Sequence, residues 1–200
     1  MSKTKEVKRL WLAGAASGKR KSQIIAYIGV MTALNVVMNA VASIPLGFTQ
    51  FSLTIFTSVL TGILIGPLYG FTACFIGDTL GYIIANTGAN GWTPWIGLAT
   101  AMMAFVGGLI FNGLDWHGKG AWAGKLMIIC LVTFVVSTVV INTTAMYLMW
   151  YRKAFDSWWI FLVTRLFLQG QIFNSLINYG LLFVVLPALA KVKPLKINIG

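Results

Sequence analysis

The sequence is poor in charged residues, and acidic residues are the rarest. Its 200 residues include only 4 Asp and Glu together and a single His, and charged residues make up 10%. Soluble domains carry roughly 25% charged residues. With 58% hydrophobic residues and a mean hydropathy of +0.83, the composition excludes an ordinary soluble domain. We interpret the chain as an integral membrane protein.

The chain also lacks the residue clusters that catalysis needs. An intramembrane hydrolase or transferase needs a nucleophile with a base, or carboxylates arranged on a metal. The acidic residues are far apart in sequence: Glu6, Asp78, Asp115 and Asp156. His117 lies in a predicted loop, and segment 14–20 lacks the Ser or Thr that holds magnesium in a phosphate loop. We expect no enzyme activity, metal or cofactor, so any ATP dependence must come from a partner chain.

The 2 cysteines do not indicate a disulfide framework. Cys74 and Cys130 are each embedded in apolar segments. Such cysteines are typical of small buried hydrophobic positions. We expect neither a disulfide nor a metal pair.

Long apolar runs fill most of the chain. A membrane-spanning helix needs about 20 mostly apolar residues, and six windows meet this need: 24–44, 51–68, 69–87, 95–113, 125–150 and 159–189. The fold class we predict is an all-α integral membrane protein with six transmembrane helices. We divide the chain into a basic N-terminal segment over 1–23, a six-helix substrate-binding domain over 24–189 and a basic tail over 190–200. The N-terminal segment has the pattern of an amphipathic helix at the membrane interface.

The basic residues predict the orientation, since Lys and Arg concentrate in cytoplasmic flanks. Of the 15 Lys and Arg residues, 12 fall on the side of the N-terminus if six helices cross the membrane. Only Arg152 and Lys153 fall on the other side, and Arg165 lies within a helix. We therefore predict a multi-pass protein of the cell membrane with both termini cytoplasmic. Because the bases gather at the chain ends, the net charge of +11 does not indicate nucleic-acid binding.

The predicted external loops are rich in Trp, amides, Gly and Pro. They cover 43–50, 86–95 and 150–159. An interfacial aromatic belt explains part of this composition. The Gly- and Pro-rich turns around Asn86 and Asn90 also fit a loop that folds over a binding site.

Two charged residues lie at predicted membrane depth, where a charge costs at least about 2.5 kcal/mol. Asp78 is in the third window and Arg165 is in the outer part of the sixth. They are either substrate or gating groups, or structural groups that form an ion pair or hydrogen bonds between helices. Asn35 and Asn39 are spaced by four, as are Asn174 and Asn178, so each pair lies on one helix face and could bind a ligand or join helices.

Small residues at a spacing of four occur in the first two windows, as Gly29 with Ala33 and Gly62 with Gly66. Such pairs allow two helices to approach closely. They serve either packing within the chain or docking of a second membrane subunit.

Together these features resemble the substrate-binding S components of energy-coupling factor (ECF) vitamin transporters, most of all the folate-type branch. The motifs that carry the resemblance are Gly-Ile-Leu-Ile-Gly-Pro-Leu-Tyr-Gly over 62–70, Gly-Asp-Thr-Leu-Gly over 77–81, the Gly/Trp/Pro external loop and Arg165. The resemblance covers about residues 24–189.

The resemblance implies a vitamin-binding subunit that works with a transmembrane coupling subunit and two cytoplasmic ATPases. It implies capture of the vitamin outside and release inside by reorientation in the membrane. Gly29 and Ala33 would match the surface that meets the coupling subunit. The substrate would lie between the external loops and the outer halves of the helices, on residues that include Asn35, Asn39, Gln50, Asn86, Asn90, Trp92, Trp95, Trp158, Arg165 and Gln169.

The substrate is the least determined feature. Folate-binding members tend to carry an arginine late in the first span, where this chain has Asn39 and Ala40. Because the predicted site is rich in amides and indoles, the prediction favours cobalamin. Folate or pantothenate in the same role is the alternative. An alternative of another class is a stand-alone channel or proton-coupled carrier that uses Asp78 and Arg165.

Overall fold

The computed structural model describes residues 19–40, 44–46, 49–85, 91–116, 118, 120–192, 195 and 197. The predicted amphipathic helix before residue 19 and the predicted lid residues 86–90 lie outside this part of the chain. Of the predicted basic segments, the described part holds Lys19, Arg20 and Lys21 at one terminus and Lys191 at the other.

The first half of the described chain holds four helices and a short hairpin. In chain order these are α2 (Lys21–Ala40), β1 (Ile44–Leu46), β2 (Thr49–Phe51), α3 (Thr54–Ile65), α4 (Pro67–Ala85) and α5 (Pro94–Gly113). Both α4 and α5 begin with a proline, whose fixed φ and missing N–H suit the first position of a helix.

The second half forms two long helical stretches. The first runs without a break through α6 (Ala121–Thr133), the π-helical segment η2 (Phe134–Thr143), α7 (Thr144–Met146) and the π-helical segment η3 (Tyr147–Tyr151). The second contains α8 (Trp158–Val163), the π-helical segment η4 (Thr164–Leu168) and α9 (Gln171–Ala190). Ser157 caps α8 by accepting a 3.2 Å hydrogen bond from the Trp159 backbone N–H.

Four helical stretches in the described residues are long and apolar enough to cross a membrane. They are α2, α5, the stretch Ala121–Tyr151 and α9. The helix α3 and the stretch Trp158–Leu168 are apolar but shorter. These helices agree with a multi-pass membrane protein, and the count of six crossings stays a prediction.

The prediction of one continuous helix over 159–189 is wrong. The helix breaks at Gln169–Gly170, because Gly170 adopts φ 72°, a left-handed conformation that glycine populates at little cost. The stretch that carries Arg165 is therefore a separate short helix joined to α9 by a sharp connection.

A second difference concerns the expectation of an entirely α-helical chain with a loop over 43–50. An antiparallel hairpin occupies this connection and pairs Ile44 with Phe51 and Leu46 with Thr49. Branched and aromatic residues favour extended backbone, and the connection is short enough for two strands to pair directly. The predicted second span accordingly contains a helix only from Thr54 to Ile65.

Glycines allow α3, α4 and α5 to approach closely. A Cβ at Gly62 would collide with the backbone carbonyl of Ala104, and a Cβ at Gly70 would lie 2.8 Å from the Gly62 Cα. A Cβ at Gly108 would lie 2.8 Å from the Pro67 nitrogen. The small-residue pattern beginning at Gly62 therefore serves packing within the chain.

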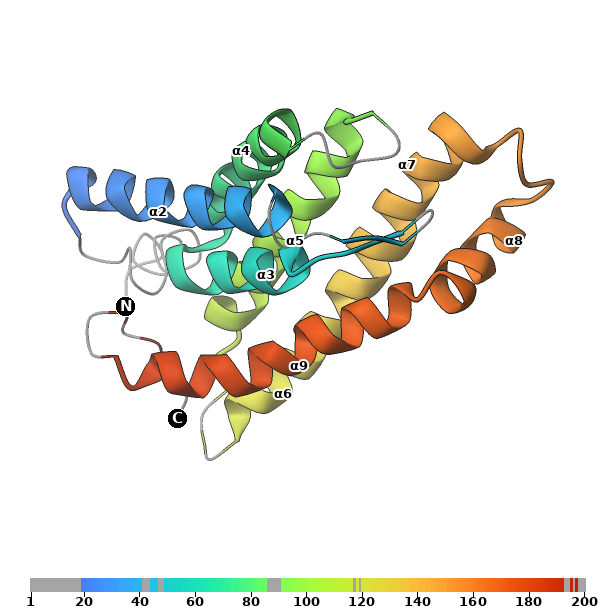
Figure 1. The fold of residues 1–200 in the computed structure, drawn as a ribbon. Helices are drawn as coiled ribbons and strands as arrows, with labels where there is room; N and C mark the ends of the chain where they lie inside the picture. Colours follow the sequence, from blue (N-terminus) through green and yellow to red (C-terminus); the bar gives the residue numbers. More distant parts are fainter. Residues whose placement is uncertain are drawn as a thin grey trace.

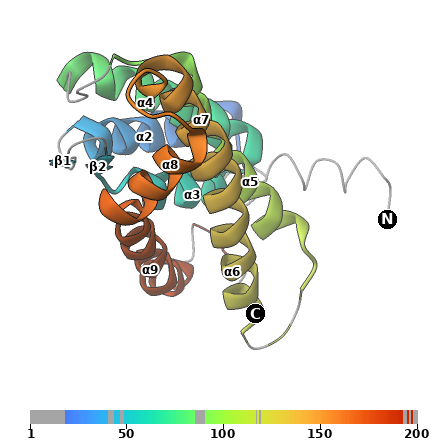
Figure 2. The ribbon, with the colours of Figure 1, turned by 90° about the vertical axis from the view of Figure 1, so that its right-hand side faces the viewer.

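The helices form one group with two additions. The helices α3, α4 and α5 contact one another and α2 packs on α3 and α4, while η2 packs on α5 and α9 packs on α3. The described N-terminal end of α2 and the C-terminal end of α9 lie at one end of the molecule, and the connection from α7 to α8 lies at the opposite end (Figure 1). Figure 2 shows α6 and α9 beside each other below α2 and α4.

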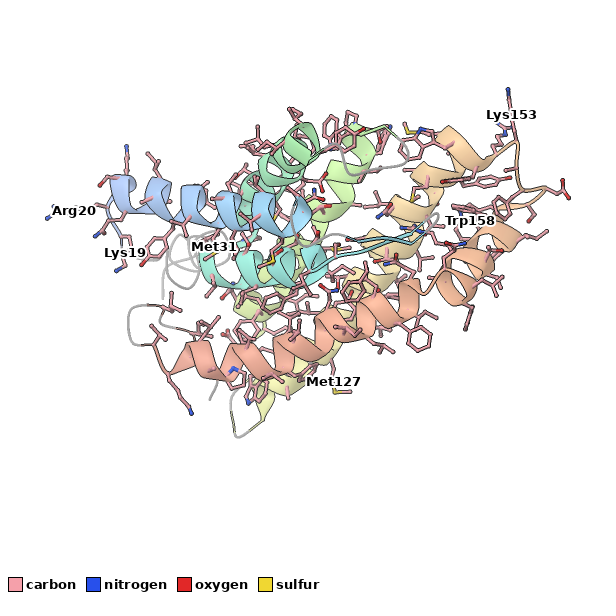
Figure 3. All side chains as sticks on the ribbon, viewed as in Figure 1. Lys19, Arg20, Met31, Met127, Lys153 and Trp158 are labelled. Atoms are coloured by element: carbon pink, nitrogen blue, oxygen red, sulfur yellow. The ribbon has the colours of Figure 1, made fainter. Side chains whose placement is uncertain are left out.

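The labelled Lys, Arg and Trp side chains lie at these two opposite ends of the molecule. Lys19 and Arg20 lie at the end where α2 begins, and Lys153 and Trp158 lie at the far end (Figure 3). The far end corresponds to the side that the charge distribution predicts to be external.

Candidate functional site

The amide of Asn35 joins α2 to α3. Its Nδ2 donates to the Met31 carbonyl oxygen at 2.8 Å and to Thr61 Oγ1 at 3.1 Å. Its Oδ1 accepts from Thr57 Oγ1 at 3.1 Å and from Ser58 Oγ at 3.3 Å. Since both ends of the amide are satisfied and the side chain is buried, Asn35 has no hydrogen-bonding capacity left for a ligand.

A carboxylate organises the predicted external side of α4. Asp78 Oδ1 accepts from Asn39 Nδ2 at 3.0 Å and from Thr100 Oγ1 at 3.2 Å, and Oδ2 accepts from Trp92 Nε1 at 3.0 Å. These bonds join α2, α5 and the residues before α5 to α4. The Trp92 ring also packs edge-on against Phe75, with centroids 6.3 Å apart. Asp78, Asn39 and Trp92 therefore form a structural junction.

Two asparagines of α9 cap the N-terminal end of α3, although they lie far from it in the sequence. Asn178 Oδ1 accepts from the Phe56 backbone N–H at 2.9 Å, and its Nδ2 donates to the Ser52 carbonyl oxygen at 2.8 Å. Asn174 Oδ1 accepts from the Ser52 N–H at 3.4 Å. The residue before α3, Leu53, offers no side-chain cap, so these amides satisfy backbone groups that the helix leaves unpaired.

Arg165 differs from all of these groups. Its side chain is only 3% exposed, and its Nη1 donates to Thr143 Oγ1 at 2.6 Å. Its Nε is buried and has no hydrogen-bond partner in the described part of the chain. Among the described residues, no carboxylate forms an ion pair with it, so the ion pair with Asp78 considered above is not formed.

Further buried polar atoms without partners lie on the same two stretches. They are Ser137 Oγ, Thr138 Oγ1, Asn142 Oδ1 and Trp158 Nε1. Trp158 and Arg165 are seven residues apart, which places them on one face of their helix. We call the set Ser137, Thr138, Asn142, Thr143, Trp158 and Arg165 the η2–η4 polar patch.

Aromatic side chains adjoin this patch toward the connection between η3 and α8. Phe161 stacks on Tyr151 with ring centroids 5.1 Å apart and meets Phe155 edge-on at 5.2 Å. Tyr147 lies 5.9 Å from Phe161. This end of the molecule therefore combines apolar flat surfaces with a buried cation.

Of the remaining predicted binding residues, those that the structure describes lie on several elements. Trp95 is 54% exposed near the start of α5, and Gln169 is half-buried at the break before α9. Gln50 lies in β2, where its backbone pairs with Pro45, but its side chain is outside the description. Asn86 and Asn90 lie outside the described residues.

The sequence analysis did not select Ser137, Thr138, Asn142 or Thr143 for the site. A signal was present, because Ser137 and Asn142 are five apart, as are Thr138 and Thr143. This spacing follows the hydrogen bonding of a π-helix and not that of an α-helix.

The predicted docking residues lie on an open surface. Gly29 and Ala33 are exposed on α2, and a Cβ at Gly29 would meet no atom within 4 Å. Ile25 and Val37, on the same face at intervals of four, are 69% and 48% exposed. Packing within the described chain does not explain this small-residue pair.

Comparison with known proteins identifies the family. Residues 19–191 match the family model of the ECF-type riboflavin transporter S component. The chain belongs to this family. Its members are S components of transporters and not a family of enzymes. The resemblance stated from the sequence motifs is therefore confirmed.

Solved structures show the same fold. A crystal structure of FolT bound with folic acid has a TM-score of 0.61 and 18% identity, and the match covers 84% of this chain and 90% of that one. The S component of a bacterial ECF transporter has a TM-score of 0.55 and 13% identity, and the match covers 86% of this chain and 98% of that one. A search of curated proteins gave no match. None of these comparisons supports cobalamin, and the folate alternative fits them better.

Proposed function

We propose that this S component is the substrate-binding subunit of an ATP-driven ECF importer, and that its substrate is a vitamin with a carboxylate. Folate is the main candidate. The observation that carries the proposal is Arg165, a guanidinium that is 3% exposed with an unpartnered Nε.

A buried cation without a counter-charge is costly, because removal from water is not offset by an ion pair. A carboxylate from a ligand would supply the missing charge and would form charge-assisted hydrogen bonds with the guanidinium. Folate carries such carboxylates on its glutamate tail, and pantothenate carries one.

The hydrogen bonds of two predicted binding residues weigh against a site that recognises its substrate mainly through asparagine and glutamine side chains. Asn35 and Asn39, which the sequence analysis included in the binding site, are hydrogen-bonded to Thr61 and Asp78.

Riboflavin is the second candidate, because the matching family model names it. Riboflavin has no carboxylate, so it would leave Arg165 without a counter-charge.

We also propose that the exposed α2 face around Gly29 and Ala33 meets the transmembrane coupling subunit, and that two ATPase subunits complete the importer. Only 6% of the apolar window of α2 is buried within the chain. Small residues on such a surface allow a second helix to approach closely. Capture would occur on the external side and release on the cytoplasmic side.

Reconstitution tests the role. The chain would be co-expressed with the coupling and ATPase subunits, placed in proteoliposomes and supplied with labelled folate, riboflavin or pantothenate. We expect folate uptake that requires ATP. Uptake that continues without ATP and stops when a proton gradient is removed would support a proton-coupled carrier instead.

A further inference from the structure

The η2–η4 polar patch contains hydrogen-bonding atoms that the protein leaves unused. Ser137 and Thr138 are 0% and 1% exposed, and Arg165 is 3% exposed. Among the described residues, their Oγ, Oγ1 and Nε atoms have no hydrogen-bond partner, and neither has Asn142 Oδ1. Buried polar atoms are otherwise paired in native proteins, so a group of them on facing helices indicates a partner that binds there.

Thr143 joins Arg165 to η2, the segment that carries the other atoms. Its Oγ1 accepts from Arg165 Nη1 at 2.6 Å and donates to the Thr138 carbonyl oxygen at 2.7 Å. Asn142 precedes Thr143, and Ser137 precedes Thr138, so the two polar pairs follow each other along η2. The guanidinium of Arg165 is therefore held at the turn of η2 that contains Thr138 and Thr143, and Ser137 and Asn142 are their neighbours in the sequence.

The unused atoms define what the partner must offer. Arg165 Nε is a donor that needs an acceptor, and a carboxylate suits it best. Asn142 Oδ1 is an acceptor that needs an N–H or O–H donor, which a carboxylate does not provide. The hydroxyls of Ser137 and Thr138 either donate or accept, so they suit a neutral carbonyl beside the donor.

We propose that the η2–η4 polar patch recognises an N-acyl amino acid unit. Its carboxylate would bind Arg165, its amide N–H would donate to Asn142, and its acyl oxygen would accept from Ser137 or Thr138. The proposal rests on the proposed function and narrows its substrate class. Folate, with its aroyl-glutamate, and pantothenate, with its acyl-β-alanine, both contain this unit, and riboflavin does not.

A pair of small probes tests the amide. The full-length chain in lipid nanodiscs would be titrated by calorimetry with N-benzoyl-L-glutamate and with the matching ester, in which oxygen replaces the amide N–H. We expect the amide to bind at least about tenfold more tightly, because the ester leaves Asn142 Oδ1 without a donor. Equal binding of the two probes would overturn the inference.

Variants give a second measurement that does not depend on the probe pair. Asn142→Leu and Thr138→Val each remove an unused polar atom, so the ligand-free protein should keep its thermal stability while affinity for N-benzoyl-L-glutamate falls about tenfold. Thr72→Val, which removes an exposed hydroxyl bonded only to its own helix, is the matched control and should change neither quantity. Lower stability with unchanged affinity would show a structural role and contradict the inference.

The failure of the inference and that of the proposed function are distinguishable. Tight folate binding without measurable binding of N-benzoyl-L-glutamate would overturn the N-acyl amino acid site and leave the importer role standing. Binding of riboflavin alone would overturn both the site and the carboxylate substrate.

Discussion

At the scale of single residues, the buried polar side chains fall into two groups. Asn35, Asp78 and Asn178 are fully engaged with neighbouring helices. Arg165 and the hydroxyls of Ser137 and Thr138 retain unpartnered atoms. Substitution in the first group should lower stability, and substitution in the second should lower ligand affinity and leave stability intact.

Asp78 provides a test of the first group. Asp78→Ala would remove the carboxylate that accepts from Asn39, Trp92 and Thr100. Asn39 and Thr100 keep 3.3 Å hydrogen bonds to the backbone oxygens of residues 78 and 96, so the main loss falls on the Trp92 N–H, and an unsatisfied buried group costs roughly 1 to 3 kcal/mol. We expect a clear fall in the thermal unfolding midpoint. Asp156→Ala, at an exposed aspartate, is the control. If Asp78→Ala melts with the control but no longer binds ligand, Asp78 belongs to the binding site.

Gly62 tests the packing of α3 against α5. Gly62→Ala would force the new methyl group into the Ala104 carbonyl, and overpacking costs about 1 to 3 kcal/mol. We expect lower thermal stability in detergent and a smaller yield of monodisperse protein. Gly180→Ala is the matched control, because a Cβ there meets no atom within 4 Å. Equal stability of the two variants would argue against the close approach.

Sequence analysis found the unusual residues but not their partners. Asp78 and Arg165 stand out because a charge in an apolar segment needs a reason. Their sequence positions do not reveal that Asp78 receives Trp92 and Thr100, or that Arg165 meets Thr143. Those contacts depend on how distant helices pack. The amides of Asn35 and Asn39 were therefore predicted to bind ligand, although the fold engages them internally.

At the scale of elements, the start of α3 depends on α9. Asn178→Ala would remove the acceptor for the Phe56 N–H and the donor to Ser52, and loss of a helix cap costs about 0.5 to 2 kcal/mol. We expect reduced thermal stability and faster hydrogen exchange at the Phe56 amide. Unchanged exchange at Phe56 in Asn178→Ala would contradict the capping.

Hydropathy predicted where helices lie better than where they end. The windows 69–87 and 95–113 correspond closely to Pro67–Ala85 and Pro94–Gly113. The window 159–189 missed the break at Gly170, because an average over many apolar residues does not register one glycine at φ 72°. The hairpin before α3 was missed for a related reason, since three paired residues on each strand are too few for a periodic pattern.

At the scale of the whole molecule, we expect the open face of α2 to be the surface that meets a partner subunit. Gly29→Leu adds bulk where the chain itself leaves space, so the isolated protein should keep its stability and ligand affinity. Assembly with the coupling subunit should weaken, because overpacking at an interface costs about 1 to 3 kcal/mol. Co-purification measures this, with Gly180→Leu on α9 as the control at another open glycine.

The docking prediction has a distinct contrary result. If Gly29→Leu loses ligand binding or stability while it still assembles with the coupling subunit, the α2 face is not the docking surface. If Gly180→Leu disrupts assembly equally, the effect is one of added bulk on any exposed helix.

The family was predictable from sequence because close helix packing restricts which residues fit at the positions of its motif. The motif over 62–70 places Gly62, Pro67 and Gly70 where α3, α4 and α5 meet, so the fold restricts these positions directly. The substrate was less predictable. Amide-rich composition favoured cobalamin, while the described part of the fold leaves unpartnered atoms on the buried Arg165 guanidinium and on the hydroxyls of Ser137 and Thr138.

The most direct test of the account is a calorimetric titration of folate and riboflavin into the parent chain and Arg165→Leu, combined with thermal unfolding without ligand. The account predicts folate binding that weakens about tenfold or more in Arg165→Leu, from loss of a charge-assisted interaction. It also predicts ligand-free stability that is unchanged or higher, since a buried unpaired charge is removed. Riboflavin binding that is unaffected by Arg165→Leu, in a chain that does not bind folate, would contradict the account.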